Sequence, residues 1–89
     1  MKNGFDVINS IFAECFRNGF QMIDVHYSLR DQYAVFSARE RFPEQGKEKY
    51  STHLYIPGHG MISGQYDLTK AQASQSLIER FDDLQGGAQ

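Results

Sequence analysis

Three histidines are the residues of this sequence whose chemistry is most versatile: His26, His53 and His59. A zinc site takes three or four ligands from His, Cys and carboxylate side chains held close together. His26 and His53 fall on one predicted sheet face but two strands apart, and no dense set of Cys or acidic residues accompanies them. His59 lies between Gly58 and Gly60 in a predicted loop, where an exposed side chain suits contact with a partner. We therefore expect no metal and no other cofactor.

Nucleophilic catalysis would need a Ser or Cys beside a His base and an orienting acid. The chain has these residue types in Asp24, Ser51, His53 and Ser63, but no segment resembles the strained turn that presents a nucleophile. Cys15 falls on the apolar side of a predicted helix, which favours a buried thiol. Because no acid, base and nucleophile converge, the sequence predicts a protein that is not an enzyme.

Length and charge limit the remaining classes. A chain of 89 residues can fill one core, so we expect a single domain over residues 1–89 with a frayed tail from about residue 85. Nine Lys and Arg against eleven Asp and Glu give a net charge of −2, which disfavours generic nucleic-acid binding. With no leader and no apolar stretch approaching 18 residues, we expect a cytoplasmic protein that does not enter a membrane.

Two amphipathic helices are predicted, one near each end of the chain. Apolar residues recur at spacings of three and four between Phe5 and Phe16, which predicts a helix from about Asn3 to Asn18. Thr69 followed by Gln72 has the spacing of a capping box and predicts the start of the second helix. Gly86 and Gly87 would end it.

Between the helices the apolar period changes to two, which is typical of half-buried strands. Four strands are predicted, over residues 23–29, 33–42, 50–56 and 62–68. The expected fold class is α+β in the order αββββα, with an antiparallel four-stranded meander and both helices on one face of the sheet.

The strand register follows from matching residues across the turns. Pairing Leu29 with Ala34 across a two-residue turn places Asp24 opposite Arg39, and Leu54 then faces both Ala38 and Gly64 on its neighbouring strands. This register collects apolar side chains on one face, beneath both helices. The predicted core consists of Ile8, Phe12, Phe16, Val25, Phe36, Leu54, Leu77 and Phe81.

The opposite face of the sheet would then be polar and free of helices. An antiparallel sheet often leaves such a face to water, and it is also a surface on which a partner could bind. Aromatic residues and Arg dominate binding hot spots, so they are the first candidates for contact. The predicted partner-binding residues are His26, Tyr33, Arg39, Arg41, His53, Tyr55 and His59.

Two resemblances bear on function. The element order, with Gly64 before the segment Thr69-Lys70-Ala71-Gln72-Ala73 and the stripe Leu77-Ile78-Glu79-Arg80-Phe81, resembles the plan of double-stranded-RNA-binding domains. That resemblance implies a Lys cluster at the start of the last helix, and here Lys70 alone matches, with Gln72 and Gln75 at the neighbouring positions. As a class, small acidic domains without motifs are similar to phage and plasmid accessory proteins, including anti-CRISPR inhibitors.

The sequence therefore predicts a non-enzymatic binding or inhibitor protein that occupies a surface of a host protein or ribonucleoprotein complex. The alternative is a nucleic-acid-binding module of the double-stranded-RNA-binding plan, and the third is an enzyme acting on a small ligand. A homodimer formed through an exposed sheet edge is compatible with each.

Overall fold

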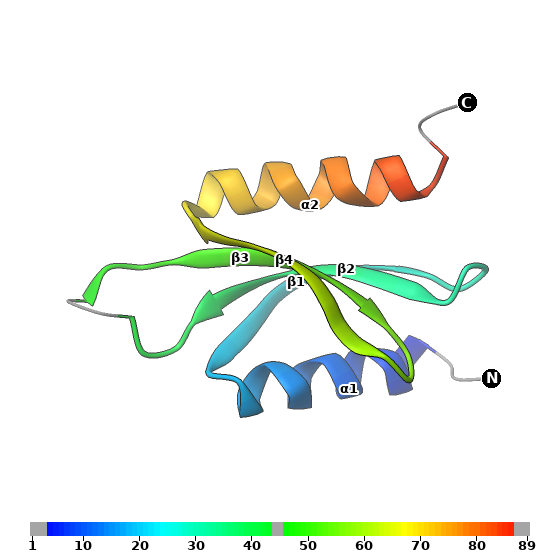
Figure 1. The fold of residues 1–89 in the computed structure, drawn as a ribbon, viewed down its shortest axis with the longest axis horizontal. Coiled ribbons are helices and arrows are strands. Elements are labelled where there is room, and N and C mark those ends of the chain that lie inside the picture. The colour runs from blue at the N-terminus through cyan, green and yellow to red at the C-terminus, as the bar shows by residue number, and fades with distance from the viewer. Residues whose placement is uncertain (1–3, 44–45, 87–89) are drawn as a thin grey trace.

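The computed structural model describes residues 4–43 and 46–86, and it confirms an α+β fold built on a four-stranded antiparallel meander (Figure 1). Asn3 and residues 87–89, where the helix start and part of the frayed tail were predicted, lie outside the described residues. The strands are hydrogen-bonded in sequence order. The elements are α1 (Gly4–Arg17), β1 (Phe20–Ser28), β2 (Tyr33–Glu40), β3 (Tyr50–Ile56), β4 (Gly60–Leu68) and α2 (Lys70–Leu84).

Local sequence signals account for the helix ends. Helix α1 stops before Gly19, whose φ of 83° is a left-handed conformation that costs glycine little. At the start of α2, the Thr69 side chain accepts a hydrogen bond from the Gln72 backbone N–H, and the Gln72 side chain accepts one from the Thr69 N–H. The predicted capping box is therefore confirmed.

The two helices lie on opposite faces of the sheet, so the prediction that both cover one face is wrong (Figure 1). Helix α1 buries Val7, Ile11 and Cys15 in one cluster with Ala34, Phe36 and Ala38 of β2. Helix α2 contacts the other face, where the Thr52 and Ser76 hydroxyls form a hydrogen bond. The consequence is visible in β2, where residues 34–38 are all buried because a helix covers each side.

The first hairpin keeps the predicted faces but not the predicted register. Residues 29–32 form a four-residue loop, in which Gln32 has a left-handed φ of 58° and its N–H donates to the Ser28 carbonyl. Tyr27, and not Leu29, therefore pairs with Ala34, and Asp24 pairs with Ser37 in place of Arg39. From Asp24 onward, this shift of two residues leaves the same side chains on the same face. Before the bulge at Ile23 the faces change, and Met22 packs against the α1 core in place of the face that carries Asp24.

The register between β2 and β3 differs from the predicted register by an odd number of residues, so each β3 side chain lies on the face opposite to the one predicted. Ala38 pairs with Ser51, where Leu54 was predicted, so His53 and Tyr55 face the α1 core and Leu54 faces α2. The prediction that His53 and Tyr55 are exposed is wrong, because their exposed fractions are 1% and 6%. Leu54 now pairs with Ser63, and Gly64 lies opposite His53.

The single predicted core is also corrected. Leu77 is buried on the α2 side and Phe36 on the α1 side, so these residues belong to separate layers. Phe12 and Phe16 keep exposed fractions of 52% and 57%. Within the described residues, no helix is long and apolar enough to cross a membrane.

Candidate binding surface

The predicted partner-binding residues do not form one surface. His53 lies between the rings of Phe20, Phe36 and Tyr66, with ring centroids 5.1–5.6 Å away, and its Nε2 is 2.8 Å from the Ser51 hydroxyl. Tyr55 belongs to the α1 core. Neither side chain is available to a partner in the folded protein.

Other predicted contact residues lie on the α2 side of the sheet or in a loop. The His26 and Tyr33 rings approach the Phe81 ring of α2, at centroid distances of 5.2 and 6.1 Å. Arg39 donates a hydrogen bond of 3.0 Å to the Gln21 side chain and lies 3.9 Å from a Glu48 carboxylate oxygen. His59 is exposed in the loop between β3 and β4, as predicted.

Arg41 links the end of β2 to the end of α1. Its Nη2 donates a hydrogen bond of 2.8 Å to the Phe16 carbonyl, which belongs to the last turn of α1, where carbonyls have no partner within the helix. Its backbone N–H donates to the Gly19 carbonyl at 2.9 Å. The positive guanidinium also complements the negative end of the helix dipole. Arg41 thus fixes the position of α1 against the sheet.

The Arg41 guanidinium lies over two phenylalanine rings. Its central carbon lies 3.9 Å from the centroid of the Phe16 ring and 4.9 Å from that of Phe42. Both distances are within the range of cation–π attraction. Arg41 therefore holds the exposed Phe16 ring of α1 close to the exposed Phe42 ring, which follows β2.

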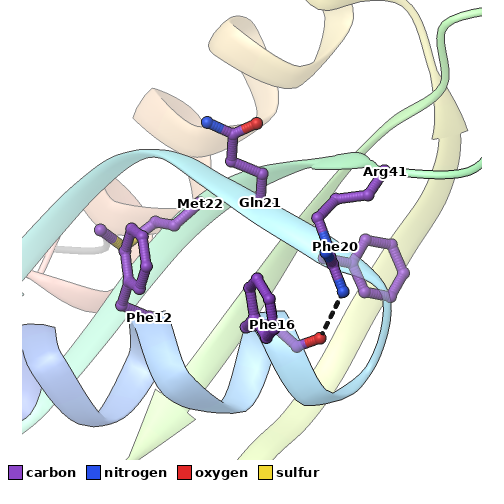
Figure 2. A pocket seen from close by; sticks show the side chains of 6 residues that line it. All are labelled: Phe12, Phe16, Phe20, Gln21, Met22 and Arg41. Carbon is purple, nitrogen blue, oxygen red and sulfur yellow. Dashed lines mark hydrogen bonds between the residues drawn. The ribbon is translucent and has the colours of Figure 1, made fainter.

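A hollow of about 220 Å³ opens between α1 and β1 beside Arg41 (Figure 2). Figure 2 shows Phe12 next to Met22, and Phe16 beneath the Arg41 side chain that bonds its carbonyl. We call this hollow, together with the adjoining Phe42 ring, the aromatic groove. Its members are Phe12, Phe16, Phe20, Gln21, Met22, Arg41 and Phe42.

Three phenylalanine side chains of the aromatic groove are unusually exposed to solvent. Phe42 is 76% exposed, and Phe12 and Phe16 are each more than half exposed. Single exposed apolar residues are ordinary on protein surfaces, but a contiguous apolar patch around a concave site marks a binding surface. The groove is therefore the strongest candidate site in the described part of the chain.

Of the groove residues, Arg41 alone was among the predicted partner-binding residues. The missed signal is the width of the apolar stripe on α1, which has two rows: Val7, Ile11 and Cys15 form one, and Ile8, Phe12 and Phe16 form the other. Each row follows the i, i+4 spacing of one helix face. One helix lying on a sheet buries one such row fully, and the structure buries the row with the smaller side chains.

The pair of Ser51 and His53 has the geometry of a nucleophile and a base but not the access. Both side chains are 1% exposed, so no substrate reaches them. Burial, and secondly the charge of Arg80, lowers the pKa of His53 to about 4. Cys15 is equally enclosed, and burial, with a smaller effect from Glu14, raises the pKa of its thiol to about 11. Among the described residues, no three His, Cys, Asp or Glu side chains cluster as metal ligands would.

Known proteins give no further guide to the site. No protein-family model, no curated protein and no solved structure matches this chain, so the two resemblances stated above rest on the sequence alone.

Proposed function

We propose that this protein is a non-enzymatic binding protein that acts by occupying a surface of a partner protein, and that the aromatic groove makes the contact. The observation that carries the proposal is the exposure of Phe12, Phe16 and Phe42 around a stacked arginine. Interface centres are enriched in aromatic residues, Met and Arg, and these are the residue types that line the groove.

The energetics of exposure support a partner that covers the groove. Burying a Phe side chain fully is worth about 1.5–3 kcal/mol, so three rings that are each more than half exposed leave several kcal/mol of burial unused in the isolated protein. That energy becomes available when a partner excludes water from the rings. The stacking on Arg41 also restrains Phe16 and Phe42, which lowers the conformational entropy lost on binding.

Charge favours a protein over a nucleic acid as the partner. Helix α2 carries Lys70 and Arg80 against Glu79, Asp82 and Asp83, so its formal charge is −1. The Arg80 guanidinium is already bound to the Thr52 carbonyl and the Ser63 hydroxyl, at 3.2 and 2.8 Å. This helix therefore offers little attraction to phosphates, in contrast to what the double-stranded-RNA-binding plan requires.

The resemblance to phage and plasmid inhibitors agrees with a small protein that works through one contact surface. On that basis the proposed partner is a protein component of a host complex, and the proposed effect of binding is to block the surface that is covered. Burial of Ser51 and His53 supports a binding role over catalysis.

Affinity capture from host lysate, treated with nuclease and read by mass spectrometry, tests this proposal. The parent protein should enrich a defined complex, and the double variant Phe12→Ser, Phe16→Ser should lose it. The matched control is Ile78→Ser, because Ile78 is 59% exposed on α2, on the opposite face of the sheet.

Equal capture by the parent and the groove variant would exclude the groove as the contact. Loss of capture after nuclease treatment of the parent sample would instead favour the nucleic-acid-binding alternative. A thermal melt of each variant checks that the fold is intact.

A further inference from the structure

The outer edge of β1 is the more regular of the two free edges of the sheet. The other edge strand, β4, has register shifts near both ends, and Asp67 there has a left-handed φ of 59°. Such bulges obstruct pairing with a further strand. β1 has one register shift, at Ile23, and residues 24–28 then pair continuously with β2. An added strand would therefore find its longest uninterrupted template on β1.

The hydrogen-bonding direction of β1 identifies which residues face outward. The Asp24 backbone N–H points inward and donates to the Ser37 hydroxyl of β2. Because backbone groups alternate in direction along a strand, the N–H and C=O groups of Val25 and Tyr27 point away from the sheet. Val25 is the outward-facing residue that lies between Asp24 and His26, and these three residues follow the bulge at Ile23 directly.

The side chains on either side of Val25 have complementary chemistry. Asp24 and His26 are both exposed, and both lie on the α2 side of the sheet. Among the described residues Asp24 forms no ion pair, and the ring contact of His26 is with Phe81. If a second copy of this strand paired in antiparallel fashion with Val25 opposite Val25, the Asp24 carboxylate of each copy would face the His26 imidazole of the other.

We propose that two copies of this chain form a dimer by antiparallel pairing of their β1 edges, with the two Val25 residues opposite each other at the two-fold axis. Val25 then exchanges two backbone hydrogen bonds with Val25 of the second copy. Asp24 faces His26 of the second copy, and His26 faces its Asp24, at the closely spaced non-hydrogen-bonded positions. The four-stranded sheets of the two copies then form one continuous eight-stranded sheet.

This proposal is independent of the proposed function. The proposed contacts of Asp24, Val25 and His26 lie on the C-terminal side of the bulge at Ile23, whereas Phe20 and Met22 line the aromatic groove on the other side. The oligomeric state is measured on the purified protein alone, and capture of a partner is measured separately. If the dimer is not observed, the proposed function is unaffected, and the reverse also holds.

Substitutions that change the charges at residues 24 and 26 test the proposed pairing of the two β1 strands. Sedimentation equilibrium of the parent should show a reversible dimer. His26→Asp places like charges opposite each other at two symmetric positions, which should weaken the dimer roughly three- to thirtyfold. Asp24→Lys should weaken it similarly. The double variant Asp24→Lys, His26→Asp restores opposite charges in both contacts and should recover the dimer.

The recovery by the double variant is specific to this register, because no other alignment of two β1 strands brings residues 24 and 26 into reciprocal contact. Asp82→Lys on α2 is the control for a change of net charge and should leave the dimer unaffected. A parent that stays monomeric at high micromolar concentration would overturn the proposal. So would a double variant as dissociated as either single variant, provided that its melting curve shows a folded protein.

Discussion

His53 couples the stability of this protein to pH through its burial. Its ring is enclosed by aromatic side chains, and its hydrogen bond to Ser51 links two side chains of the α1 layer. A charged imidazole would have no water around it there, so the folded state holds the neutral form. The lowered pKa, about 4, expresses this preference.

The sign of the pH effect follows directly. The unfolded chain binds a proton at His53 near the ordinary pKa of about 6.5, and the folded protein does not until about pH 4. The contribution of neutral His53 to the free energy of unfolding is therefore fully present above pH 6.5. It is lost as the pH falls from 6.5 towards 4, by up to about 3 kcal/mol. Urea unfolding at a series of pH values measures the loss.

The variant His53→Phe serves as the control for that measurement, because it keeps an aromatic ring and removes the titrating group. Its free energy of unfolding should vary less with pH in this window, although other acidic groups still contribute. If parent and variant lose the same stability between pH 6.5 and 4, His53 does not titrate as the structure requires.

Single residues show where the sequence was informative. The flanking glycines predicted His59 as an exposed loop residue, which the structure confirms. Residue chemistry selected Arg41, which lines the aromatic groove, although its contact with a partner stays a prediction. The sequence did not place His53 or Tyr55, because the face on which a strand residue lies depends on the register with a neighbouring strand. That register is not encoded in the residue itself.

At the scale of elements, α1 carries two apolar rows with different roles, and substitutions should separate them. Ile11 is fully buried against the sheet, so Ile11→Ala should cost about 2–5 kcal/mol. Phe12 is half exposed in the neighbouring row, so Phe12→Ala should cost clearly less although it removes a larger side chain. Chemical denaturation of the two variants compares them, and a greater loss for Phe12→Ala would contradict the assignment of the rows.

Element boundaries were predicted well where capping and turn residues are distinctive. The strand over residues 50–56 and the Thr69 cap were both predicted correctly. The long connection between β2 and β3 imposes no register, because a connection of this length allows several alignments. Hydrophobicity favours Tyr50, Leu54 and Ile56 over Ser51 and His53 for a buried face. Because α2 covers the second face of the sheet, the more apolar set of β3 does not show which residues face α1.

At the scale of the whole molecule, the layer arrangement follows from the need to cover both faces of the central strand. Val35 and Phe36 are adjacent in β2 and both fully buried, on opposite faces. Helices on one face would leave one of these residues in water. The run of small and apolar residues from Ala34 to Ala38 is the sequence signal for two covered faces, since strands buried on both sides lack polar alternation.

This arrangement also explains why the aromatic groove is open. With α2 on the far face, nothing among the described residues covers the outer flank of α1, where Phe12 and Phe16 lie beside β1 (Figure 2). Both helices on one face would have enclosed this flank. We therefore propose that a protein partner covers this flank.

The most direct test is the affinity of the captured partner for groove variants, measured by calorimetry. Phe12→Ala and Phe16→Ala should each weaken binding by about 2 kcal/mol or more, roughly thirtyfold in Kd. Ile62→Ala and Ile78→Ala are the controls, because their exposed fractions of 51% and 59% match those of the two phenylalanines. These controls should bind within about threefold of the parent. Unchanged affinity in both phenylalanine variants would contradict the claim that the aromatic groove is the binding surface.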